Sequence, residues 1–92
     1  MLTVNYSAKF KKDLKLMKKR GLDMQKIFTV MVDLENEIPL KRKYKEHLLQ
    51  GDYRGFSECH IEPDWLLVYS IDSQKKELYF ARTGSHADLF KQ

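Results

Sequence analysis

The first residues alternate in a pattern that predicts a strand followed by a helix. Residues 2–6 read LTVNY, and the period of two is typical of a short strand. Ser7 is suited to cap a helix, because its hydroxyl can accept a hydrogen bond from the first turn. The apolar residues that follow recur at helical spacing, at Phe10, Leu14 and Met17. Gly21 predicts the end of this helix.

A second helix is predicted directly afterwards. Asp23 is a suitable N-cap, and Pro39 marks the end of the segment because proline cannot continue a helix. Between them the apolar residues again follow helical spacing, at Ile27, Val30, Met31 and Leu34. The short connection between the two helices favours an antiparallel hairpin whose apolar faces pack on a common partner.

Three further segments are β-prone and predict consecutive strands, at residues 53–61, 64–72 and 76–83. The breaks between them are short enough for hairpins. The segment 64–72 is apolar on both faces, which predicts a central strand. Residues 85–90, with Ser85 as a cap, predict a short final helix.

The predicted order is therefore β-α-α-β-β-β followed by a short helix. This order indicates an α+β fold in which two N-terminal helices pack on an antiparallel-rich sheet. A chain of 92 residues is expected to form one domain, residues 1–92.

Composition and charge narrow the setting in which the protein acts. Seventeen Lys and Arg residues against thirteen Asp and Glu residues leave a net charge of +4. Residues 1–26 hold eight of the bases and two of the acids, so this part is expected to attract a polyanion or an acidic protein. No segment has the length of a membrane span or the order of a secretory signal. With Cys59 as the single cysteine, we expect a cytoplasmic protein without disulfides or membrane partners.

The residues best suited to chemistry are predicted to meet at one edge of the sheet. In an antiparallel meander the end of one strand and the start of the next share an edge. The residues at these positions are His60, Asp64, Trp65, Arg82 and His86. The third histidine, His47, precedes the first of these strands.

This inventory suits the cleavage of RNA. A base must take the proton of the 2′-hydroxyl, a cation must stabilise the phosphorane and an acid must protonate the leaving 5′-oxygen. Histidine has an ordinary pKa of about 6.5 and can serve as base or acid. Arginine presents several donors to phosphate oxygens, and Trp65 and Phe90 offer ring faces for an unstacked base. No metal or other cofactor is required.

Other interpretations of the same residues stay open. Trp65 at the start of a strand also fits a core position, and a single histidine is often structural. A zinc site would use His47, His60, Asp64 and His86, although their spacing matches no close-pair motif. Cys59 precedes His60 on the predicted strand and should point to the opposite face, which argues against a Cys–His nucleophile.

Four fragments carry a resemblance to a known family: YKEHLLQG from residue 44, YRGF from 53, CHIEPDWLLVY from 59 and RTGSHADLF from 82. Together they resemble the YafQ branch of the RelE-like toxins. The resemblance implies a type II toxin, an endoribonuclease that cuts mRNA in the A site of the 70S ribosome. It also implies a cognate antitoxin encoded alongside, through which alone the complex binds operator DNA.

The resemblance assigns the site residue by residue. As a hypothesis for their roles, we expect Asp64 and His86 to transfer protons, and His47 and His60 to position the 2′-hydroxyl or to share in the proton transfers. The remaining assignments are charge stabilisation by Arg82, nucleotide contacts by Trp65 and Phe90, and a weaker RNA contact by Arg54.

Two other functions are compatible with the predicted fold. One is a non-enzymatic toxin of the ParE branch, which acts on DNA gyrase through protein contacts. The other is an RNA-binding or ribosome-binding module that would need only the basic helices. Three histidines converging with an arginine count against the ParE-like toxin. The binding module would be unaffected by alanine at His60 and His86.

Overall fold

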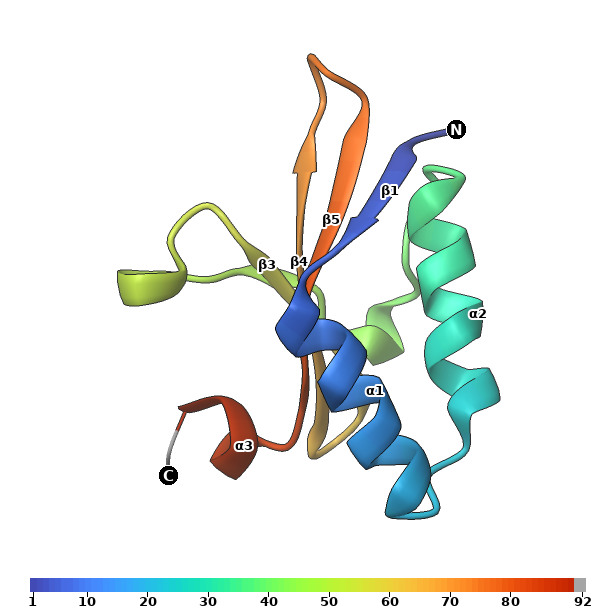
Figure 1. Ribbon diagram of the computed structural model, residues 1–92. Coiled ribbons are helices and arrows are strands. Elements are labelled where there is room, and N and C mark those ends of the chain that lie inside the picture. Colours follow the sequence, from blue (N-terminus) through green and yellow to red (C-terminus); the bar gives the residue numbers. More distant parts are fainter. Residues whose placement is uncertain (91–92) are drawn as a thin grey trace.

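The computed structural model describes residues 1–90, and a five-stranded mixed sheet lies at its centre (Figure 1). Its strands are β1 (Thr3–Tyr6), β2 (His47–Leu48), β3 (Ser57–Glu62), β4 (Trp65–Asp72) and β5 (Glu77–Gly84). Their order across the sheet is β1-β5-β4-β3-β2. All neighbours are antiparallel except β1, which pairs in parallel with β5. The predicted α+β fold and the central place of β4 are confirmed.

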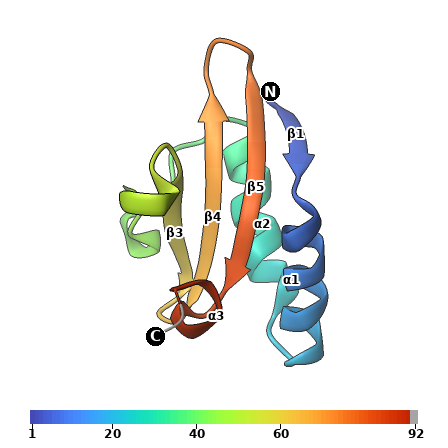
Figure 2. The same cartoon turned by 60° about the vertical axis from the view of Figure 1, so that its left-hand side comes forward.

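Helices cover the two faces of the sheet unequally. Helices α1 (Ala8–Lys19) and α2 (Met24–Glu35) lie together against one face. The short helix α3 (His86–Phe90) lies near the opposite face, at the end of β5 (Figure 2). Side chains from both helices and the sheet form the main core, among them Phe10, Ile27, Val30, Leu67, Leu78 and Phe80. Within residues 1–90, no helix is long and apolar enough to cross a membrane.

The predicted caps fix both long helices at their N-termini. Ser7 Oγ accepts a hydrogen bond from Phe10 N at 2.9 Å and donates one to the Ala81 carbonyl at 2.6 Å. This cap therefore also ties the start of α1 to β5. Asp23 Oδ1 accepts a hydrogen bond from Gln25 N at 3.1 Å and opens α2 in the same way.

The predicted boundaries are wrong around the middle of the chain. Residues 51–53 form a 3₁₀ turn, η2, rather than the start of a strand. Gly55 then takes a φ of 93°, which suits glycine and breaks an extended strand, so β3 begins only at Ser57. Helix α2 ends at Glu35, before Pro39. The turn η1 (Arg42–Tyr44) and strand β2 were not predicted.

A second, smaller core lies on the sheet face that α1 and α2 leave open. Buried residues of β4, β5 and α3 form it: Leu66, Val68, Ala81 and Leu89. Partly buried side chains from the segment before β3 and from α3 pack around it: Leu49, Tyr53, Phe56 and Phe90. This core holds α3 and the η2 segment on the same face of the sheet.

Replacing the fully buried Thr83 by valine should destabilise the protein by about 2–3 kcal/mol. The Thr83 hydroxyl accepts a hydrogen bond from Trp65 Nε1 at 2.9 Å and donates one to the Leu66 carbonyl at 2.6 Å. Valine has a similar shape but leaves both partners unpaired. Urea unfolding measures the change, with Thr29→Val on the exposed side of α2 as the control. Equal stabilities of the two variants would contradict this role of Thr83.

Candidate active site

Four rings from three elements form a row on the open side of the sheet. The ring centroids of His47 and His60 are 6.1 Å apart, and those of His60 and His86 are 5.9 Å apart. The row continues from His86 to Phe90 at 6.4 Å. The structure therefore brings the three histidines and Phe90 together, and the meeting of His60 with His86 is the one that the predicted topology required.

A buried carboxylate lies beneath two of these histidines. Glu58 Oε1 is 3.4 Å from His47 Nε2 and 3.6 Å from His60 Nε2. The Glu58 side chain is only 5% exposed, and its Oε2 atom has no hydrogen-bond partner among the described residues. Glu58 pairs directly with His47 across β2 and β3. Glu58 was not predicted as a site residue, although its place two residues before His60 puts both on one face of β3.

Backbone carbonyls orient the same two imidazoles. His47 Nδ1 lies 2.9 Å from the Lys45 carbonyl oxygen, and His60 Nδ1 lies 3.3 Å from that of Pro63. A carbonyl can only accept, so each Nδ1 carries a proton. The other nitrogen of each ring, Nε2, therefore faces Glu58.

The third histidine has a carboxylate partner of its own. Asp64 Oδ1 accepts a hydrogen bond from the backbone N–H of His86 at 2.9 Å and lies 2.6 Å from His86 Nδ1. These two bonds, the backbone one first, lower the pKa of Asp64 below its ordinary value. Because the ionised carboxylate holds Nδ1, His86 Nε2 is the ring nitrogen left for a substrate.

Arg82 is held by a residue of α1. Asp13 accepts hydrogen bonds from Arg82 Nε at 2.7 Å and Nη2 at 3.2 Å, and from the backbone N–H of Thr83 at 3.1 Å. The Asp13 carboxylate is the main cause that raises the pKa of Arg82, with a smaller contribution from Tyr53. The Tyr53 ring in turn contacts Phe90, at a centroid distance of 5.7 Å. Arg82 therefore lies on the Phe90 side of the ring row.

The cluster at His47, Glu58 and His60 also has the composition of a metal site. One ligand atom from each lies within 4.8 Å of the others, and imidazole nitrogens with a carboxylate oxygen suit zinc or copper. This set differs from the predicted zinc alternative, because Asp64 and His86 bond to each other instead.

Comparison with known proteins assigns the chain to a family. Residues 2–91 match the family described as a bacterial toxin of type II toxin-antitoxin system, YafQ. The mRNA interferase toxin YafQ of Escherichia coli K12 is 46% identical over 88 residues, which cover 95% of this chain and 94% of the relative. The chain belongs to the YafQ family of type II toxins. By class it is an endoribonuclease.

Two solved structures share the fold over nearly the whole chain. YafQ in the E. coli DinJ-YafQ toxin-antitoxin complex is 44% identical with a TM-score of 0.88, and 97% of each chain is covered. A metal-bound toxin from Helicobacter pylori is 48% identical with a TM-score of 0.91, covering 98% of this chain and 100% of that one. The RelE-like fold predicted from the sequence is thus confirmed.

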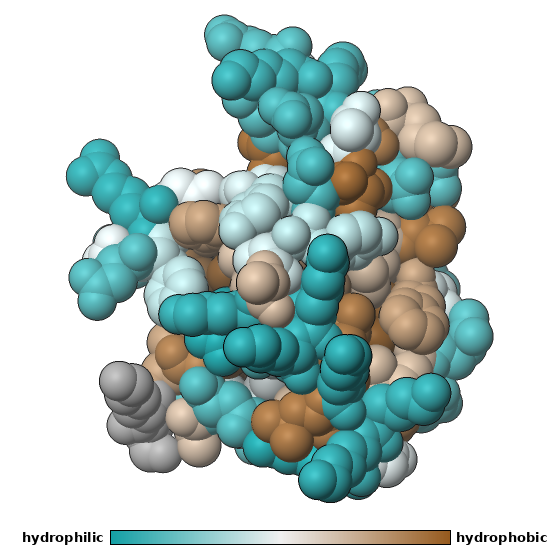
Figure 3. All heavy atoms as spheres, in the orientation of Figure 1, coloured by the Kyte–Doolittle hydropathy of each residue, from teal (hydrophilic) through white to brown (hydrophobic). Residues whose placement is uncertain are grey.

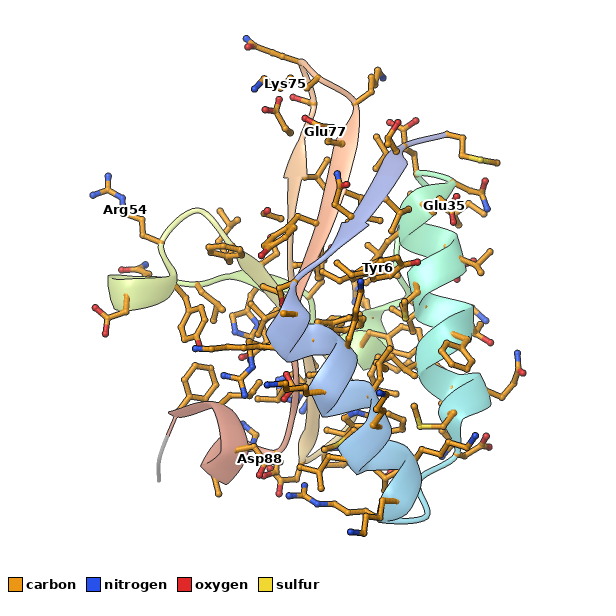
Figure 4. The ribbon with its side chains drawn as sticks, in the orientation of Figure 1. Tyr6, Glu35, Arg54, Lys75, Glu77 and Asp88 are labelled. Atoms are coloured by element: carbon orange, nitrogen blue, oxygen red, sulfur yellow. The ribbon has the colours of Figure 1, made fainter. Side chains whose placement is uncertain are left out.

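Two predicted site residues of this YafQ-family chain lie outside the row. Trp65 is only 2% exposed and belongs to the main core under the helices. The prediction that Trp65 contacts a nucleotide is therefore wrong, since its ring face is not accessible and its N–H is bonded to Thr83. Arg54 is exposed and points away from the other side chains (Figure 4), so its RNA contact stays a prediction.

Cys59 takes no part in the site. It is fully buried in the main core, on the face opposite His60 as predicted. Burial, with the nearby carboxylates of Glu46 and Glu58, raises the pKa of Cys59 to about 12. A thiol that stays protonated at neutral pH is a poor nucleophile.

An ion pair with α1 anchors the helix that carries His86 and Phe90. Arg20 donates to both carboxylate oxygens of Asp88, at 2.7 and 3.0 Å. Asp88 also accepts a hydrogen bond from Ser85 N at 2.9 Å, and Ser85 Oγ accepts one from Asp88 N at 3.1 Å. This reciprocal pair is a capping box. Figure 4 shows Asp88 at the side of α3 that faces the end of α1.

Replacing Asp88 by asparagine should destabilise the protein in a pH-dependent way. Arg20 and the Ser85 N–H lower the pKa of Asp88 far below its ordinary value. The stabilisation is therefore present above the unfolded pKa of about 4 and is lost as the pH falls through the folded value. We expect a loss of about 1 kcal/mol near neutrality, since Arg20 is 42% exposed and solvent screens its charge.

Urea unfolding from about pH 7 to about pH 2 measures this difference between wild type and Asp88→Asn. Asp52→Asn, at an exposed position of η2, is the control and should track the wild type throughout. An advantage of the wild type that stays constant over the whole range would contradict the assignment.

Proposed function

We propose that the protein cuts mRNA in the ribosomal A site by metal-independent acid–base catalysis and that a cognate antitoxin neutralises it. The observation that best supports this proposal is the row of three imidazoles, each of which lies beside a carboxylate. Glu58 lies beneath His47 and His60, and Asp64 bonds to His86.

The reaction is a transesterification followed by release of the cut strand. A base removes the 2′-hydroxyl proton, the 2′-oxygen attacks phosphorus, and the bond to the 5′-oxygen breaks as an acid protonates that oxygen. The products are a 2′,3′-cyclic phosphate and a 5′-hydroxyl. In each reaction the base gains a proton and the acid loses one, so the site needs two groups that can exchange protons.

The geometry suggests which groups these are. His86 presents Nε2 while Asp64 holds its Nδ1 atom, and we assign this pair to one of the two proton transfers. His60 and His47 turn Nε2 toward Glu58, so the carboxylate would stabilise a proton on either ring and support the other transfer. The neighbouring imidazole would position the 2′-hydroxyl.

Arg82 and Phe90 would hold the substrate. Arg82 remains charged beside Asp13 and would stabilise negative charge on the phosphorane with its remaining donors. Phe90 is half-buried at the end of the row and contacts Tyr53 edge-on. An aromatic ring in this position would support one unstacked base.

The partners follow from the family and from the charge of the surface. E. coli YafQ has been solved with DinJ, and we propose an antitoxin encoded beside this chain, with operator DNA bound only through that complex. The exposed lysines of α1 form a hydrophilic band in Figure 3. This band would suit ribosomal RNA or an acidic antitoxin segment. The protein would act in the cytoplasm, where ribosomes translate.

His86→Ala and Arg82→Ala should each reduce cleavage of ribosome-bound mRNA by about 10²-fold or more, since each removes a proton-transferring or charge-stabilising group. Cleavage of a defined message on programmed ribosomes measures the effect. Wild-type protein that has been stripped of metals with EDTA and then freed of the chelator should cut at the same rate as untreated protein. Lys75→Ala, on the exposed β4–β5 turn, is the control. Undiminished cutting by both site variants, with the fold intact, would overturn the proposal.

Glu58→Gln should lower cleavage by about tenfold or more without lowering stability. The amide keeps the shape of the side chain but can no longer stabilise a proton on the facing Nε2 atoms. A carboxylate with an unpartnered buried oxygen costs stability, so the variant should unfold in urea at the same or a higher midpoint. Glu77→Gln on β5, also half-buried but outside the ring row, is the control. Full activity of Glu58→Gln would exclude the role proposed for Glu58.

A further inference from the structure

A cavity of about 430 Å³ opens beside His60, and the proposed reaction does not yet use it. Its walls come from the first turns of α2, from η1 and from the turn between β3 and β4. His60 belongs both to this cavity and to the ring row. The cavity and the proposed site of cleavage are therefore adjacent.

The charges of the cavity favour an anion. Three lysines line it, at positions 26, 43 and 45. Lys26 Nζ is paired with Glu62 at 3.2 Å, and the other acid of the lining, Asp23, caps α2. Among residues 1–90, Lys43 and Lys45 have no carboxylate at ion-pair distance. Two uncompensated ammonium groups at the rim suit a phosphate.

The same wall carries an aromatic ring. Tyr44 is half-buried and packs against the main core, so its position is fixed from behind. The ammonium group of Lys43 lies 5.2 Å from the centroid of the Tyr44 ring. A lysine on a flexible stem can move aside from this face, and a nucleobase stacks on such a ring with about 1–3 kcal/mol.

A scissile phosphodiester joins two nucleotides, and the structure offers a ring on each side of the imidazoles. Phe90 adjoins His86 at one end of the row, and the cavity with Tyr44 adjoins His60. We propose that the cavity binds the second nucleotide at the cut, the one that Phe90 does not hold. Tyr44 stacks on its base, and Lys43 and Lys45 contact its phosphate. The inference rests on the proposed nuclease function and makes Tyr44 a specificity-determining residue.

The test compares three tyrosine variants on programmed ribosomes. Tyr44→Leu keeps an apolar side chain against the core but removes the stacking face, whereas Tyr44→Phe keeps that face. Tyr6→Leu makes the same change at a 46% exposed tyrosine of β1, outside this cavity. The messages carry each of the four bases, or an abasic nucleotide, on either side of the cut.

Tyr44→Leu should cut about tenfold more slowly, which is the lower part of the range expected from the loss of one stacked base. It should also lose discrimination among the four bases at one of the two flanking positions. An abasic nucleotide at that position should slow the wild type and Tyr44→Phe by a similar factor and leave Tyr44→Leu unaffected. Tyr6→Leu should behave as the wild type.

Two outcomes would overturn the inference while leaving the nuclease proposal standing. One is unchanged rate and base preference of Tyr44→Leu. The other is a slower cleavage by Tyr44→Leu that an abasic nucleotide at either position slows further, by the same factor as in the wild type. This result would mean that Tyr44 acts only through the fold. Urea unfolding of Tyr44→Leu identifies the second case. Failure of the nuclease proposal is distinguished by undiminished cutting of His86→Ala.

Discussion

The pairing of β4 with both of its neighbours is the constraint on which the site depends. Leu66 pairs with His60 of β3 on one side and with Gly84 of β5 on the other. This register brings one histidine and the start of α3 to the same end of the sheet, although they are far apart in the sequence. His86 follows Gly84 by two residues and therefore meets His60. A shift of β3 by one residue relative to β4 would turn His60 to the helix-covered face.

The two faces of the sheet differ in how they treat buried polar groups. The face under α1 and α2 buries Trp65 and Cys59 with their polar atoms satisfied or protonated. The open face keeps Glu58 buried with one oxygen unpartnered, an arrangement that costs stability and is typical of functional sites. The small core of the open face contains Leu66 and Val68, and Val68 pairs with Glu58 across β3 and β4, so this core supports the carboxylate.

Periodicity and caps were enough to predict the helices, the order of the strands and the meeting of His60 with His86. They could not predict the face of the sheet on which Trp65 lies, because the segment 64–72 is apolar on both faces. They also failed between residues 40 and 56, where the turns η1 and η2 depend on tertiary contacts rather than on a repeating pattern. The ion pair of Arg82 with Asp13 joins residues 69 positions apart, so no local sequence pattern predicts it.

Three aspartates fix the segment from Arg82 to Asp88 by one repeated device. Each carboxylate accepts a backbone N–H of this segment and a side-chain N–H: Asp13 from Thr83 and Arg82, Asp64 from the backbone and ring of His86, and Asp88 from Ser85 and Arg20. The aspartates belong to α1, to the β3–β4 turn and to α3 itself. The lowered pKa values of Asp64 and Asp88 keep these two acceptors ionised at neutral pH. A five-residue helix is too short to be stable alone, so the orientation of His86 and Phe90 depends on these bonds and on the burial of Leu89. The position of the reactive groups is thus set by electrostatics at both ends of the segment rather than by the helix that carries them.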